Sequence, residues 1–152
     1  MPQEEIQKQF GQSQEKYVYC LIALCVAAIG FSIHKSTGTP LKWIQIPLGL
    51  AIIFWSGSVY FGLKFIRYCI AVLWKNNAYL DVSKGVSAVT GKDPVKIEIA
   101  ASVLTESIYD VGKKAEKMFK YQTYCIYVGF VLFMAWHVLE MYSRTTFAPC
   151  GN

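Results

Sequence analysis

Three long stretches of this sequence contain no Asp, Glu, Lys or Arg, and they limit the possible folds more than any other feature. They cover residues 17–34, 43–63 and 121–139. At a rise of about 1.5 Å per residue, helices of this length cross the apolar core of a bilayer. Segments this few cannot close a β-barrel, so only helices satisfy every backbone polar group in lipid. The sequence therefore predicts an all-α integral membrane protein with three transmembrane helices.

The composition also favours lipid as the solvent of this chain. Of its 152 residues, 54% are hydrophobic and 16% are charged, whereas soluble domains carry roughly 25% charged residues. A chain of this size has too little interior to hide so much apolar surface. We expect one membrane domain over residues 1–152, with the lipid bilayer as a partner.

The distribution of basic residues gives the expected topology. Ten of the fifteen Lys and Arg residues lie between Lys64 and Lys120, mixed with six acids. Because short loops rich in Lys and Arg stay in the cytoplasm, we expect residues 64–120 and the N-terminus to be cytoplasmic and the C-terminus to lie outside. The intermixed acids argue against a basic arm, so the net charge of +5 does not indicate nucleic-acid binding.

The segment after the second span combines basic and apolar side chains. Lys64, Arg67, Ala71 and Lys75 share one helical face, and Phe, Leu and Trp side chains occupy the other faces. This pattern is typical of an amphipathic helix in the cytoplasmic membrane interface, and we predict one over 64–80. In the alternative, the helix is tilted, and Lys64 and Arg67 face a water-filled interior where intramembrane cations line a pathway.

A polar loop is predicted over 76–93, followed by a long helix. Asp93 is a typical N-cap residue, and Pro94 suits the first helical position. No helix breaker separates Pro94 from the third span, which we place at about 121–142. We therefore expect one continuous helix, in which residues 94–120 form a cytoplasmic stalk below the last span.

The stalk carries a heptad repeat of apolar residues, which we call the seam. Alternating steps of four and three residues, the spacing of a coiled coil, join seven positions: Ile97, Ala101, Leu104, Ile108, Val111, Ala115 and Met118. Such a seam needs an apolar partner. The partner is either the segment 64–80 of the same chain or the seam of another copy, and the spacing does not distinguish the two.

Small residues four positions apart occur in two of the spans. One pair is Ala23 and Ala27, and the other is Ser58 and Gly62. Such pairs allow helix backbones to approach closely in lipid. We expect them to serve helix packing, either within one chain or between copies.

Sequence motifs for chemistry are absent. The chain has no GxSxG, no HExxH and no cluster of acids in a span. His34 and His137 are expected toward the outer leaflet, where an interfacial role is more common than haem ligation, and Glu140 is the only acid near His137. We therefore expect no enzymatic activity, no metal site and no bound cofactor.

Two functions fit these features. In the first, the chain assembles with copies of itself as a homo-oligomeric pore or membrane-perturbing protein, a channel with Lys64 and Arg67 near its mouth. In the second, it is a non-catalytic accessory or adaptor subunit that binds other membrane subunits through the cytoplasmic part 76–120. The seam and the small-residue pairs favour self-assembly, whereas the small size and the lack of chemistry favour an adaptor.

Overall fold

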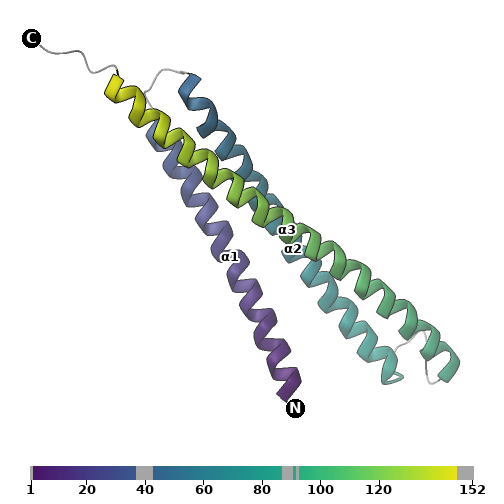
Figure 1. Ribbon diagram of the computed structural model, residues 1–152. Helices are drawn as coiled ribbons and strands as arrows, with labels where there is room; N and C mark the ends of the chain where they lie inside the picture. Colours follow the sequence, from purple (N-terminus) through teal and green to yellow (C-terminus); the bar gives the residue numbers. More distant parts are fainter. Residues whose placement is uncertain (1, 37–42, 87–90, 92, 147–152) are drawn as a thin grey trace, which may run out of the picture. The chain divides into compact units, whose positions relative to one another are not determined.

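The computed structural model describes residues 2–36, 43–86, 91 and 93–146, and its regular elements are helical (Figure 1). They are α1 (Pro2–Ser36), the short 3₁₀ turn η1 (Trp43–Gln45), α2 (Ile46–Ser83) and α3 (Pro94–Thr146). Within these described ranges there is no strand. The predicted all-α class is therefore confirmed.

Three segments are long and apolar enough, by length and composition, to cross a membrane. They are Gly11–Ser36, Trp43–Ser83 and Pro94–Ser143. Each contains one of the spans expected from the sequence, so the number of candidate spans is confirmed and is compatible with a membrane location. The side of the membrane on which each terminus lies stays a prediction.

The helix boundaries agree with the sequence at α3 and differ at α2. One uninterrupted helix runs from Pro94 to Thr146, as the sequence predicted. The predicted loop over 76–93, however, was wrong in its first part, because α2 continues to Ser83. The reason is tertiary packing: Val82 is only 7% exposed, and burial of such side chains outweighs the weak helix propensity of the Asn pair at 76–77.

The end of α2 is a Schellman motif. The amide of Gly85 donates to the carbonyl of Val82, and the amide of Val86 donates to the carbonyl of Asp81, each at 3.0 Å. Gly85 has a φ of 68°, the left-handed conformation that glycine adopts without steric cost. The motif satisfies carbonyl groups that the last helical turn leaves open, and so it fixes where the helix ends.

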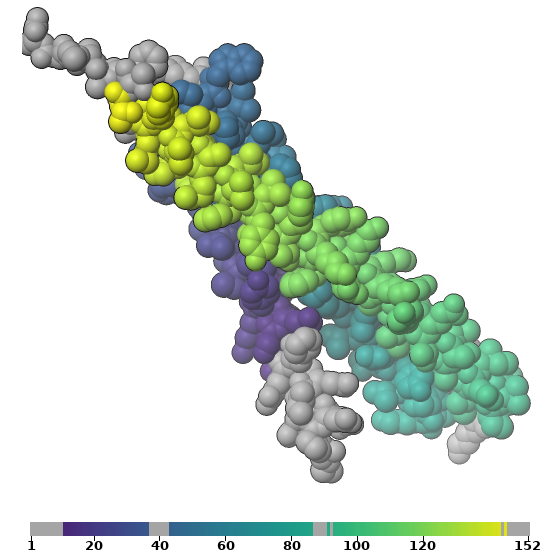
Figure 2. Space-filling model, in the orientation of Figure 1, coloured from purple at the N-terminus to yellow at the C-terminus, as the bar shows by residue number. Residues whose placement is uncertain are grey.

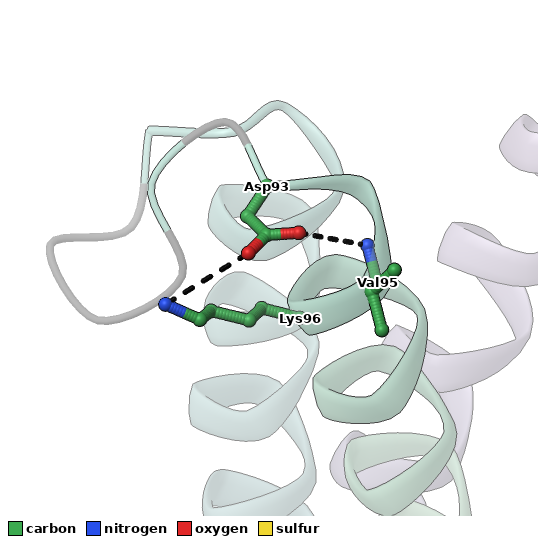
Figure 3. Close-up of polar contacts among 3 residues, drawn as sticks. All are labelled: Asp93, Val95 and Lys96. Atoms are coloured by element: carbon green, nitrogen blue, oxygen red, sulfur yellow. Dashed lines mark hydrogen bonds and ion pairs between the residues drawn. The ribbon is translucent and has the colours of Figure 1, made fainter.

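The start of α3 is capped as the sequence predicted (Figure 3). Asp93 Oδ1 accepts a hydrogen bond of 3.1 Å from the amide of Val95, and Pro94 is the first helical residue. The other carboxylate oxygen of Asp93 lies 3.8 Å from Lys96 Nζ. An N-cap of this kind satisfies one of the amides that a helix start leaves without a partner.

The chain divides into two compact units. The first, which we call the bundle unit, consists of Met1–Gly62 and Tyr121–Asn152, and the second, the hairpin unit, is Leu63–Lys120. In the bundle unit, Cys25, Ala51 and Trp55 form a buried cluster. Aromatic rings join all three helices there: the ring centroid of Phe133 lies 5.6 Å from that of Trp55 and 6.5 Å from that of Phe31.

Candidate functional site

The seam lies on the less exposed side of α3 in the hairpin unit. Ala115 is 7% exposed, and the other six seam residues are half-buried. Two contacts join this part of α3 to α2: the rings of Phe65 and Phe119 lie 5.6 Å apart, and Lys75 donates a hydrogen bond to Ser107. In Figures 1 and 2 the teal end of α2 and the green start of α3 lie side by side. These contacts place α2 of the same chain beside the half-buried side of α3, and the partner of the seam itself stays a prediction.

The face that α2 turns toward α3 has its own heptad spacing. The positions 65, 68, 72, 75, 79 and 82 alternate by three and four residues, and all six are buried or half-buried. Phe65 and Val82 are each 7% exposed. Within the hairpin unit, α2 and α3 therefore pack in antiparallel order, since Phe65 meets Phe119 and Lys75 meets Ser107.

The predicted basic stripe is divided by this packing. Lys64 is half-buried and Arg67 is exposed, while Lys75 belongs to the side that faces α3. The segment 64–80 is part of the uninterrupted α2 and is not a separate helix. Its position in the membrane interface therefore stays a prediction.

The two small-residue pairs have different environments. Ser58 is fully buried, and a Cβ at Gly62 would come within 2.7 Å of Gln122 Nε2 on α3 and 3.0 Å of Ile22 Cδ1 on α1. Ala23 and Ala27 are exposed. Close helix approach in the bundle unit therefore occurs at the second pair, and the first pair faces outward.

The bundle unit contains polar side chains that the sequence reasoning did not select. Gln122 is fully buried, and neither polar atom of its amide has a hydrogen-bond partner among the described residues. Cys25 Sγ donates to Ser58 Oγ at 3.7 Å. The signal available in the sequence was a Gln inside an otherwise uncharged span, because polar groups in such spans face other helices and not lipid.

A second close approach in the bundle unit was also missed. A Cβ at Gly129 would lie 2.6 Å from Trp55 Nε1 and 2.7 Å from its Cδ1. The indole of Trp55 therefore packs directly on the backbone of α3. A lone Gly inside an apolar span carries this information only weakly, since Gly is frequent in membrane helices.

The histidines considered for metal or haem binding lie at the surface of their helices. His34 and His137 are both exposed. Among the residues that the structure describes, no group of three or more His, Cys, Asp or Glu side chains could hold a metal ion.

Comparison with known proteins yields no relative. No protein-family model, no curated protein and no solved structure matches this chain. The argument for function therefore depends on the geometry of the two units.

Proposed function

We propose that the protein is a non-catalytic membrane subunit whose hairpin unit binds other protein chains. The three apolar helices would anchor the chain in a bilayer. The hairpin unit would present the contact surface outside the lipid.

One observation carries this proposal: the hairpin unit closes its own seam and still exposes large apolar side chains. On α3, Val95, Ile99 and Val103 are 60–63% exposed, and on α2, Leu73 and Trp74 are 63% and 74% exposed. Contiguous apolar side chains left on a water-exposed surface are typical of interaction sites.

Helix length supports a location of this surface outside the lipid. α2 has 38 residues and α3 has 53, which correspond to about 57 Å and about 80 Å at 1.5 Å per residue. A bilayer with its headgroups is about 40–45 Å thick. Helices that cross it must therefore extend into water.

A pore has less support than a binding subunit. The seam was one of the features that favoured a pore, and it is half-buried within one chain. Self-association therefore needs a different surface.

Photo-crosslinking tests the proposal. A photoreactive amino acid replaces Val103, which is 60% exposed on the hairpin unit, or Val131, which is 65% exposed on a candidate span and serves as the matched control. In the membranes of cells that naturally produce the protein, position 103 should give discrete protein adducts and position 131 only lipid adducts.

The adducts also identify the partner by mass. An adduct of twice the chain mass indicates a second copy, and any other discrete mass indicates a different subunit. Lipid adducts alone at both positions would contradict the proposed function.

A further inference from the structure

The part of α2 in the hairpin unit carries a second heptad repeat, which we call the outer stripe. Steps of three and four residues join six positions: Leu63, Ile66, Ile70, Leu73, Asn77 and Leu80. Ile66 is half-buried, and the other five are exposed. The exposed fraction is 48% for Ile70 and 63% for Leu73. The outer stripe is therefore a regular row of mostly apolar side chains that is exposed at five of its six positions.

The outer stripe lies on the side of α2 that faces away from α3. The opposite side meets α3 through Phe65 and Lys75. Successive residues of an α-helix are about 100° apart, so the stripe lies about half a turn away from those contacts. α3 of the same chain therefore does not cover it.

The residue types of the stripe match a parallel pair of helices. In heptad notation the a positions are Leu63, Ile70 and Asn77, and the d positions are Ile66, Leu73 and Leu80. β-branched residues at a with Leu at d favour two strands, and a single Asn at a fixes register and strand number. Positions 70 to 80 follow that pattern without exception.

The charges beside the stripe allow two copies to pair in parallel. In that arrangement an e position meets the g position of the other copy. Trp74 and Asp81 at e would then meet Cys69 and Asn76 of the second copy, respectively. Asn76 can donate a hydrogen bond to the Asp81 carboxylate, and neither contact brings like charges together.

The exposed stripe cannot be explained by lipid alone. If Trp43 marks one headgroup boundary, as its aromatic character suggests, a bilayer of about 40–45 Å ends about 30 residues later, near Leu73. The four positions from Leu63 to Leu73 then lie within the bilayer, and Asn77 and Leu80 lie in water, where lipid cannot cover them.

The exposed area is sufficient for a dimer. Five large side chains in or beside the stripe are 48–74% exposed: Leu63, Ile70, Leu73, Trp74 and Leu80. Complete burial of the stripe and Trp74 would remove on the order of 600 Å² per copy, or roughly 1,200 Å² for two copies, the lower end of specific interfaces. Fewer than three heptads would associate weakly in free solution. Anchoring in one membrane raises the effective concentration of the copies and offsets this weakness.

From these observations we propose that a second copy of this chain packs along the outer stripe, parallel and in register, with Asn77 beside Asn77 of the second copy. The proposal rests on the proposed function and names the partner of the hairpin unit. The resulting interface is isologous and closes as a two-fold dimer.

Disulfide cross-linking tests the register. In a cysteine-free background reconstituted in liposomes at low protein density, Asn77→Cys at position a is compared with Ala78→Cys at position b, and both sites are exposed. With copper phenanthroline as oxidant, we expect Asn77→Cys to form at least tenfold more cross-linked dimer than Ala78→Cys. Equal yields would overturn the proposal.

A substitution that leaves the hairpin unit folded tests the surface itself. Leu73→Glu places a charge at an exposed d position, so circular dichroism should be unchanged while energy transfer between labelled copies falls at least tenfold. Leu73→Met should retain the transfer. Unchanged transfer in Leu73→Glu would contradict the proposed interface.

Two further outcomes separate this inference from the proposed function. A spin label at position 73 that is accessible to lipid-dissolved oxygen would place the stripe against lipid and overturn the dimer. If position 103 gives discrete adducts to another protein while Asn77→Cys gives no dimer, the proposed function stands and the second copy is the wrong partner.

Discussion

The bundle unit buries polar as well as apolar side chains, whereas the buried side chains described in the hairpin unit are all apolar. Among the described residues, the buried polar side chains are Ser32, Ser58 and Gln122, all in the bundle unit. The buried residues of the hairpin unit are Phe65, Val82 and Ala115, which are apolar. Both units also expose large apolar side chains, and in the bundle unit Phe31, Ile53 and Val131 are 56–65% exposed.

Under the proposed function, this difference would reflect two solvents. In water, apolar burial drives association and polar groups stay outside. In lipid that driving force is absent, so helices associate through close contacts of small residues and through interhelical hydrogen bonds. The bundle unit would then lie in lipid and the hairpin unit would extend from it into water, which would account for both patterns in one chain.

The largest effect is expected at the close contact of the bundle unit. Gly129→Ala would bring a methyl group within 2.6 Å of the Trp55 ring. Overpacking of this kind costs about 1–3 kcal/mol of the free energy of unfolding. Titration with SDS, followed by circular dichroism, measures it.

The matched control is Gly30→Ala in the same unit, because nothing lies within 4 Å of the added methyl. Its unfolding midpoint should equal or exceed that of the parent chain, since Ala favours helix over Gly by roughly 1 kcal/mol. An equal loss in both variants would remove the argument for tight packing in the bundle unit.

The seam should give the next largest effect, through a different mechanism. Leu104→Ala removes a half-buried side chain and should cost about 1–2 kcal/mol, less than the 2–5 kcal/mol of fully buried sites. The neighbouring Val103 is 60% exposed, so Val103→Ala should change stability by less than about 0.5 kcal/mol. Thermal unfolding of both variants in detergent compares them, and similar losses would mean that the seam has no partner in the chain.

Replacement of the buried amide in the bundle unit should be stabilising. Neither amide atom of Gln122 has a partner among the described residues, and a buried polar group in that state costs about 1–3 kcal/mol. Gln122→Met fills a similar volume without that cost, and we expect a gain of about 1 kcal/mol in the SDS titration. Ser58→Ala is the contrast, because it removes the acceptor of the Cys25 thiol and should give no gain. Destabilisation by Gln122→Met would show that the amide has a partner in the membrane.

The helix cap of the hairpin unit gives a smaller effect. Asp93→Ala removes the acceptor of the Val95 amide and should cost about 0.5–1 kcal/mol. Asp93→Asn keeps a capping oxygen and should retain most of the stability. Hydrogen exchange of the first turn of α3 measures the difference, and equal exchange in both variants would exclude a capping role.

The smallest effect is expected at an exposed ion pair of the hairpin unit. A hydrogen bond of 2.7 Å from Lys120, together with its charge, lowers the pKa of Glu116. Because the pKa is lower in the folded state, this contribution is present above the unfolded pKa of about 4.3 and is lost as the pH falls through the folded pKa. Solvent screens such pairs strongly.

Melting curves of the parent chain and of Glu116→Gln between pH 7 and pH 3 measure how much this ion pair contributes to stability. Its curve at pH 7 should coincide with that of the parent chain within the experimental error. A loss as large as that of Leu104→Ala would show that the pair is more than a surface contact.

The sequence alone was sufficient for features that depend on local pattern. The three uncharged stretches determined the number of apolar helices, because hydropathy and length need no knowledge of neighbours. Asp93 and Pro94 determined the start of α3, since an N-cap involves residues only a few positions apart. The absence of a breaker before the third span determined that α3 is one helix.

Tertiary structure decided which helix faces meet. The seam pattern was visible in the sequence, but spacing gives the face of a helix and not the identity of its partner. The contact of Phe65 with Phe119 places α2 of the same chain beside α3. The packing of α2 on α3 also divides residues 64–80 between the side that faces α3 and the outer stripe. The burial of Gln122 and the contact of Gly129 with Trp55 likewise depend on residues more than 50 positions apart in the chain, and no local pattern contains that information.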